Sequence, residues 1–195
     1  AFCHSFATVA TGGFSTQTTS IAAYNSLYIE IVIIVFMFAA GVNFALHYRA
    51  LTGQTKAYFQ DSEFRFYAGI WIGACILLAL INWLGINGIS LGHALRGAFF
   101  TGTSIMTTTG FCTDDFDLWP NASRILLIML MFVGGCAGST GGGVKVVRIV
   151  VVFKEVLREI QRFMQPQAIV TVKMGGQPLQ DDVVSHISAF FVIFV

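Results

Sequence analysis

A short motif of threonine and glycine occurs twice in this sequence, and its chemistry suits the binding of a dehydrated cation. Residues 10–14 read Ala-Thr-Gly-Gly-Phe and residues 107–111 read Thr-Thr-Thr-Gly-Phe, so Phe111 takes the place of Phe14, 97 positions on. Glycine permits positive φ, which lets successive carbonyl oxygens face one way and replace the water around an ion. The candidate ion-binding residues are Ala10, Thr11, Gly12, Gly13, Thr107, Thr108, Thr109 and Gly110.

The repetition itself carries much of this interpretation. One copy alone would be read as an ordinary glycine turn between two helices. Two copies indicate a chain built from equivalent units, and each copy follows a stretch that opens Ala-Phe and precedes a long apolar run. Phe14 and Phe111 are expected to pack behind the motif as supports.

The second glycine-rich segment covers residues 134–143 and interrupts an apolar stretch. Each glycine costs about 1 kcal/mol relative to alanine inside a helix, so a continuous helix is not expected there. Unwound backbone at membrane depth is tolerated only where it is buried in protein or lines water. Two other readings stay open: a flexible kink, and a phosphate-binding loop. For a phosphate-binding loop, the GxxxxG spacing fits. However, Val144 stands where the motif requires lysine, and Lys145 is followed by Val146 instead of the serine or threonine of the motif.

Charged residues flank both motifs. Lys145 and Arg148 lie three apart on an expected helix, where they could repel cations at the cytoplasmic exit or serve as positive-inside anchors. Asp114, Asp115 and Asp117 could concentrate cations at an outer mouth, or be solvated loop acids. Glu30 lies at the outer edge of an apolar run and is expected to face a vestibule.

Composition places these motifs in a membrane. Hydrophobic residues make up 55% of the chain and charged residues 11%, with a mean hydropathy of +0.74, whereas soluble domains carry about 25% charged residues. The net charge of +1 gives no sign of a nucleic-acid partner. Residues 26–48 and about 66–86 are long enough to cross a bilayer, which takes roughly 20 helical residues. Residues 90–105 are too short, which suits a re-entrant pore helix.

Lysine and arginine set the orientation and the organisation of the chain. Three of them lie in 49–65 and six in 144–173, so these segments are expected on the cytoplasmic side and both motif copies toward the outside. The predicted organisation is the end of a pore helix, a filter and a second helix over 1–48; a cytoplasmic linker over 49–65; a complete unit over 66–163; a linker over 164–178; and the first helix of a further unit over 179–195.

The unit resembles the M1–P–M2 repeat (first helix, pore helix, second helix) of the K+ transporter superfamily that contains TrkH, KtrB and HKT. Thr-Thr-Gly-Phe at 108–111 resembles the degenerate K+-channel filter of that family, and the run from Gly135 to Lys145 resembles its broken second helix. Asp-Asp-Phe at 114–116 and the long linker fit the TrkH branch best. The resemblance implies an all-α membrane protein of repeated M1–re-entrant pore helix–M2 units around a central pore, K+-channel-like, with this chain running from the end of repeat two to the start of repeat four.

The resemblance also implies a function. It is K+ uptake across the bacterial inner membrane by a multi-pass protein that is no enzyme, with K+ both transported and bound in a filter to which this chain gives two of four walls. The implied gate is an intramembrane loop of Gly138, Ser139, Thr140, Gly141, Gly142 and Gly143. The implied partners are a second copy of the protein and a cytoplasmic, TrkA-like nucleotide-binding subunit. A Na+-conducting or Na+-coupled member of the superfamily is the alternative, followed by a nucleotide-binding protein that uses the 138–143 loop.

Overall fold

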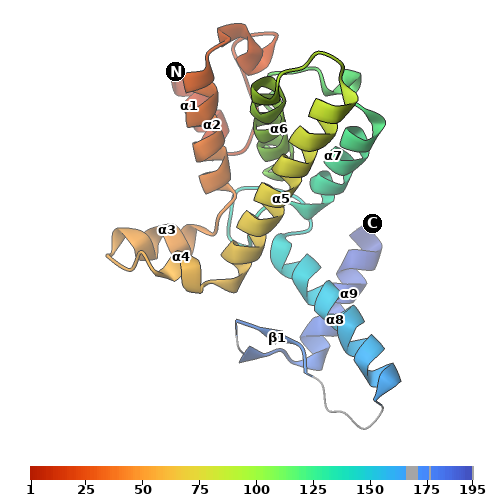
Figure 1. Cartoon of the computed structure of the whole chain (residues 1–195). Coiled ribbons are helices and arrows are strands. Elements are labelled where there is room, and N and C mark those ends of the chain that lie inside the picture. The colour runs from red at the N-terminus through yellow and green to blue at the C-terminus, as the bar shows by residue number, and fades with distance from the viewer. Residues whose placement is uncertain (166–170, 176, 195) are drawn as a thin grey trace.

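The computed structural model of the chain describes residues 1–165, 171–175 and 177–194, so parts of the predicted 164–178 linker and the last residue lie outside it. Helices dominate the described chain, and one small antiparallel hairpin joins the last two of them (Figure 1). The elements are α1 (Phe2–Val9), η1 (Ser20–Tyr24), α2 (Leu27–Ala40), α3 (Phe44–Leu51), α4 (Ala57–Gln60), α5 (Ser62–Gly85), α6 (Leu91–Met106), η2 (Phe116–Leu118), α7 (Asn121–Val133), α8 (Val146–Met164), β1 (Lys173–Met174), β2 (Gln177–Pro178) and α9 (Asp181–Phe194).

Helices α5, α6 and α7 pack together, with the short α6 along the long α5 (Figure 1). The close approach depends on Gly102 of α6, because a Cβ there would lie 3.0 Å from the Cys75 sulfur and 3.3 Å from a Leu78 methyl. The Trp71 indole donates to the Thr103 hydroxyl at 2.8 Å, which satisfies a polar group inside this apolar interface. The position of the short α6 is therefore fixed by α5.

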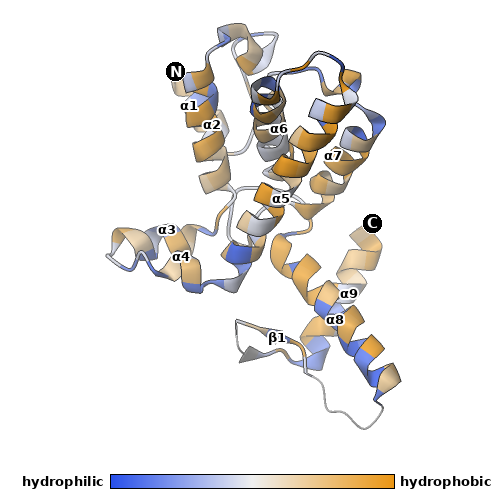
Figure 2. Cartoon of the chain, in the orientation of Figure 1, coloured by the Kyte–Doolittle hydropathy of each residue, from blue (hydrophilic) through white to orange (hydrophobic). Residues whose placement is uncertain are grey.

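The apolar surface of these helices suits a lipid environment. Apolar residues lie on all sides of α2, α5 and α7 (Figure 2), a pattern typical of helices that have no aqueous face. Within the described ranges, α5 is the one helix that is long and apolar enough to cross a membrane by itself; α2 and α3 meet the same test only as a pair bent by 102°.

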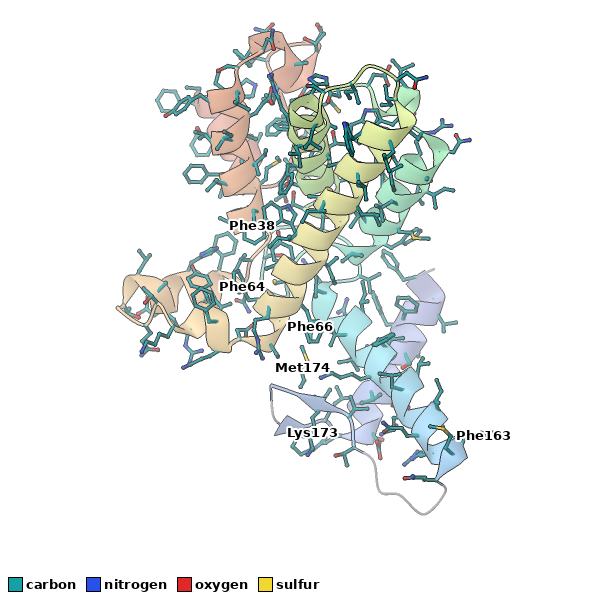
Figure 3. The ribbon with its side chains drawn as sticks, in the orientation of Figure 1. Phe38, Phe64, Phe66, Phe163, Lys173 and Met174 are labelled. Atoms are coloured by element: carbon teal, nitrogen blue, oxygen red, sulfur yellow. The ribbon has the colours of Figure 1, made fainter. Side chains whose placement is uncertain are left out.

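That bend corrects the prediction of one continuous span over 26–48. The helix stops at Ala40 because Gly41 meets the neighbouring α5: a Cβ at Gly41 would lie 2.2 Å from the Tyr67 hydroxyl oxygen. Asn43 then caps the next helix, since its side-chain oxygen accepts the Ala45 N–H at 2.9 Å. The C-terminal end of α2 is also held by Phe38, whose ring lies edge-on to the ring of Phe64 of α5, with 6.3 Å between the ring centres (Figure 3).

A second helix is interrupted at the glycine-rich segment, which separates α7 from α8. The intervening residues 134–145, called the glycine-rich loop below, contain positive φ angles at Gly134, Gly138 and Gly143. When Met37 is aligned with Met131 and Phe38 with Phe132, Gly41 takes the place of Gly135. Both second helices therefore break at the same position of the repeat.

Helices α8 and α9 pack side by side at the other end of the molecule (Figure 1). Two i,i+3 ion pairs lie along α8: Arg158 with Glu155 at 2.7 Å, and Arg162 with Glu159 at 3.3 Å. Arg158 also bonds Asp181, the first residue of α9, and so links the two helices. The hairpin lies near the start of α5 (Figure 3), where a Cβ at Gly175 would lie 3.9 Å from the Ser62 hydroxyl oxygen.

Candidate functional site

The two motif copies have the same backbone. Helices α1 and α6 end 97 residues apart, at Val9 and Met106, which is also the spacing of the motif. The Gly12 N–H donates to the Ala7 carbonyl at 2.8 Å, and the corresponding Thr109 N–H donates to the Ser104 carbonyl at 2.9 Å. The same helix end is therefore formed twice, by local bonds that belong to the repeat itself.

Positive φ angles also recur at matched positions. They are 49° at Thr11 and 58° at Thr108, then 66° at Gly13 and 88° at Gly110. Glycine adopts this region without strain, whereas a β-branched residue such as threonine does so rarely. Two threonines held in this conformation at equivalent places indicate that their surroundings fix them.

The two copies touch each other at Gly13. A Cβ built there would lie 2.1 Å from the Thr109 carbonyl oxygen and 3.2 Å from the Gly110 carbonyl carbon. Beyond the motifs, the Ala22 N–H donates to the Cys112 carbonyl at 3.2 Å. The fold thus brings residues 10–13 and 107–110 side by side. A Cβ at Gly110 would meet no atom within 4 Å, so that glycine faces open space.

The second copy is supported from behind by hydroxyl groups. Thr107 donates to the Thr103 carbonyl at 2.8 Å and shares a 2.8 Å hydrogen bond with the Thr109 hydroxyl. The Ser104 hydroxyl donates to the Phe111 carbonyl at 2.7 Å. These bonds are buried, so the backbone of this copy is held in one arrangement.

The prediction that both phenylalanines pack behind the motif is right for one of them. Phe111 is 2% exposed and lies in a core with Ala7, Ile33 and Met37, which belong to the preceding unit. Phe14 is 74% exposed. The difference is positional, because Phe111 has the preceding unit beside it and no described segment lies in the corresponding place beside Phe14.

The glycine-rich loop lies against both motif copies. The Thr108 hydroxyl accepts the Gly142 N–H at 2.7 Å. The Thr11 hydroxyl lies 3.0 Å from the Thr140 carbonyl oxygen and 2.8 Å from the Ala10 carbonyl oxygen, and it can donate to either. The Thr140 hydroxyl donates to the Val9 carbonyl at 2.9 Å. A Cβ at Gly141 would lie 3.2 Å from the Thr107 carbonyl oxygen, so the loop backbone passes close to the second copy.

Other anchors hold the start of the loop. The Glu63 carboxylate at the beginning of α5 accepts the Ala137 N–H at 2.6 Å. The Gly41 carbonyl accepts the Cys136 N–H at 2.8 Å, and the Gly138 carbonyl accepts the Phe44 N–H at 3.1 Å. The loop is therefore seated on the helix break of the preceding unit as well as on the motif copies.

Lys145, the last residue of the loop, and Arg148 do not share a helix face as expected. Helix α8 begins at Val146, because Lys145 has a φ of 75° and precedes the helix. Its ammonium group turns back and donates to the Gly141 carbonyl. The Arg148 guanidinium lies 4.2 Å from the centre of the Phe190 ring of α9. Both cations are thus used in contacts within the described chain.

The three aspartates lie in the loop after the second copy. Asp115 and Asp117 are exposed, and the Asp115 carboxylate accepts the Asp117 N–H at 3.1 Å to cap the short helix η2. Asp114 is half-buried, and its carboxylate lies where a Cβ of Gly97 would be, at 2.2 Å. Asp114 therefore packs on α6.

An ion pair that the sequence did not indicate joins α2 to α6. Arg96 Nε contacts Glu30 Oε2 at 2.6 Å, and Arg96 Nη2 contacts Glu30 Oε1 at 2.7 Å. Glu30 is 2% exposed, so the expectation that it faces a vestibule is wrong. The sequence signal for this pair was weak: Glu30 is an isolated acid in one apolar run, and Arg96 is an isolated base in the short helix predicted over 90–105.

Replacing Arg96 with alanine should destabilise the protein, because it leaves the buried Glu30 carboxylate without its partner. Arg96 keeps a side-chain exposure of 30%, so we expect a loss of about 2 kcal/mol, below the 3–5 kcal/mol typical of fully buried pairs. The measurement is thermal unfolding of the purified protein in detergent. Arg124→Ala, which removes an exposed i,i+3 bond to Asn121, is the matched control; equal effects of the two variants would contradict this role of the pair.

Comparisons with known proteins give consistent results. The family model described as TrkH, cation transport protein, matches residues 1–195. The chain is 39% identical over 189 residues to the Trk system potassium uptake protein TrkH of Escherichia coli strain K12, covering 96% of this chain and 39% of that protein. It is 40% identical over 193 residues to the protein of the same name from Halomonas elongata, covering 98% and 40%.

A solved structure gives the same match in three dimensions. The crystal structure of the potassium transporter TrkH from Vibrio parahaemolyticus aligns with a TM-score of 0.93 and 38% identity. The alignment covers 97% of this chain and 41% of that one. The chain thus spans about two fifths of the length of these relatives.

Proposed function

The chain belongs to the TrkH family of cation transport proteins, and from this premise we propose that it is part of a protein that takes up K+ across the bacterial inner membrane. Its relatives are transporters rather than enzymes, and it has their all-α membrane fold. The transported ion is the substrate of the whole protein. The 195 residues of this chain supply a part of its pathway.

We propose that the two motif copies form two walls of a K+ filter. The observation that carries the proposal is the matched backbone: equal helix ends, equal positive φ positions, and direct contact of the copies at Gly13 and Thr109. Backbone carbonyls arranged in this way can replace the water around K+ without adding full charges. On this view residues 1–48 and 66–163 are two units of the pore, joined by a cytoplasmic segment over 49–65, and 179–195 begins a third.

The glycine-rich loop is the proposed gate. It lies against the inner residues of both walls, and its glycines allow the backbone to change conformation. The Asp114, Asp115 and Asp117 group would face the outer mouth and attract cations. Lys145 and Arg148 would act near the cytoplasmic exit by holding the loop and α9, given their contacts with Gly141 and Phe190.

The phosphate-binding interpretation of this loop is not favoured by its hydrogen bonds. The N–H groups of Ala137, Ser139, Thr140 and Gly142 already donate to acceptors within the chain. A phosphate needs such groups free and directed at it. A regulatory nucleotide is instead proposed to bind a separate cytoplasmic, TrkA-like subunit, and the whole protein to act as a homodimer; both proposals follow from the family.

Replacing Gly110 with serine tests the filter assignment. The full-length protein should restore K+ or Rb+ uptake to cells that lack other K+ importers. Because Gly110 has a φ of 88° and faces open space, Gly110→Ser strains the wall and adds a side chain toward the ion path. We expect the K+ over Na+ selectivity to fall roughly tenfold, equivalent to about 1.4 kcal/mol.

Gly88→Ser is the matched control, since Gly88 has a φ of 83° and equally open surroundings in the loop before α6. It should leave selectivity unchanged. An unchanged selectivity in Gly110→Ser would overturn the filter assignment, and uptake of Na+ in preference to K+ by the unmodified protein would favour the Na+-conducting alternative.

A further inference from the structure

The inner ends of the two motif copies are tied to the glycine-rich loop by hydroxyl groups at equivalent positions. Thr11 and Thr108 occupy the same place in the repeat, and both side chains bond the loop, at 3.0 Å to the Thr140 carbonyl and 2.7 Å from the Gly142 N–H. These contacts join residues 129 and 34 positions apart in the chain. The local structure that both units share does not account for these two contacts, because the glycine-rich loop belongs to one unit only.

The conformation of the two threonines supports a specific role for these bonds. Both have positive φ, which is unfavourable for a residue that carries a Cβ. Strain of this kind persists where surrounding contacts fix the residue, and it concentrates at functional and switch regions. In both copies the strained residue is the one that contacts the loop.

Thr140 completes the arrangement from the loop side. Its hydroxyl donates to the Val9 carbonyl at 2.9 Å and also lies 3.2 Å from the Ala40 carbonyl oxygen. Val9 is the last residue of α1, and Ala40 is the last of α2. One loop residue therefore contacts the end of the pore helix and the end of the second helix of the preceding unit, while Gly142 contacts the other wall.

We propose that Thr11, Thr108 and Thr140 form a latch that holds the glycine-rich loop closed against the inner end of both walls. Opening of the loop must break these hydroxyl bonds together. The opening therefore depends on contacts with two units of the pore and not on the loop's own unit alone. The inference rests on the proposed function, since it assigns a closed state to the loop.

The test measures basal Rb+ flux into liposomes that contain the full-length protein and no regulatory subunit. Thr11→Val, Thr108→Val and Thr140→Val each remove a hydroxyl and nearly preserve side-chain volume. Each should raise the basal flux about fivefold, which corresponds to about 1 kcal/mol of lost latch stability. Thr140→Ser keeps the hydroxyl at the one position outside both walls and should behave as the unmodified protein.

Thr101→Val is the matched control, because the Thr101 hydroxyl on α6 is buried and has no hydrogen-bond partner in the described chain. It should leave the basal flux unchanged. Thr140→Val is the deciding variant, since Thr140 is exposed, does not belong to either wall, and lacks the positive φ that would strain valine at the other two positions.

A second measurement reports the loop independently of transport. Cys136 lies in the loop, carries a free thiol and is 0% exposed. The rate at which a membrane-permeant thiol reagent modifies it, followed by mass spectrometry, should rise in the valine variants and not in Thr140→Ser. Absence of Rb+ uptake by the full-length protein in cells that lack other K+ importers would contradict the proposed function, while Cys136 labelling would still test the latch. Unchanged labelling and unchanged or lower flux in Thr140→Val would overturn the latch.

Discussion

Replacing Gly13 with alanine is expected to abolish K+ uptake by the full-length protein, with a loss of at least about a hundredfold, or about 2.8 kcal/mol. The added Cβ would lie 2.1 Å from the Thr109 carbonyl oxygen, which is backbone and cannot rotate away as a flexible side chain does. The change therefore pushes the two motif copies apart. The measurement is Rb+ uptake in cells that lack other K+ importers, normalised to the amount of protein in the membrane.

The control for this variant is Gly53→Ala. Gly53 also has a positive φ, of 94°, but a Cβ there meets nothing within 4 Å, so the variant carries the backbone strain without the clash. It should transport at close to the unmodified rate. If Gly13→Ala transported equally well, the contact between the two copies would have no part in ion conduction.

Deleting residues 139–142 is expected to raise the flux measured without a regulatory subunit about tenfold, the effect of removing about 1.4 kcal/mol of closure. The deletion removes Thr140 and the glycines that lie against Thr107 and Thr108, and with them the bonds to Thr11 and Thr108. Basal Rb+ flux into liposomes measures the effect. The motif copies keep their own helix-end bonds, so K+ selectivity should be retained.

Ser139→Ala provides a comparison within the same segment. The Ser139 hydroxyl donates to the Cys136 carbonyl at 2.6 Å, a bond internal to the loop, so this variant should change the basal flux far less than the deletion. A deletion protein that reaches the membrane in normal amounts and still shows low flux would remove the gate assignment from this loop.

The local features of the fold were predictable from the sequence because short-range chemistry determines them. The short pore helix, the motif at its end and the helix interruption at 134–145 all follow from residues within one helical turn of each feature. The positive φ at Gly13 and Gly110 likewise falls where the motif contains glycine. Repetition strengthened the prediction of the motif, since it occurs in two copies.

Features that depend on distant partners were not predictable. The bend after α2 requires the Tyr67 hydroxyl to lie against Gly41, and the Glu30–Arg96 pair joins residues 66 positions apart. Phe14 and Phe111 have the same local sequence and opposite exposure, because their neighbours belong to different units. The bonds between the glycine-rich loop and the threonines belong to the same class, so the candidate site could be predicted as two separate motifs but not as one assembly.

The matched breaks in the two second helices bear on how the protein evolved. Gly41 and Gly135 occupy the same position of the repeat and lie in contact: a Cβ at Gly135 would be 2.9 Å from the Gly41 carbonyl oxygen. An interruption shared by both copies is most simply inherited from a single ancestral unit that existed before duplication. One descendant kept it as a bend, and the other lengthened it into a loop that rests on the first. A loop can thus arise from a bend by insertion at an existing break, without any change to the threonine–glycine motif.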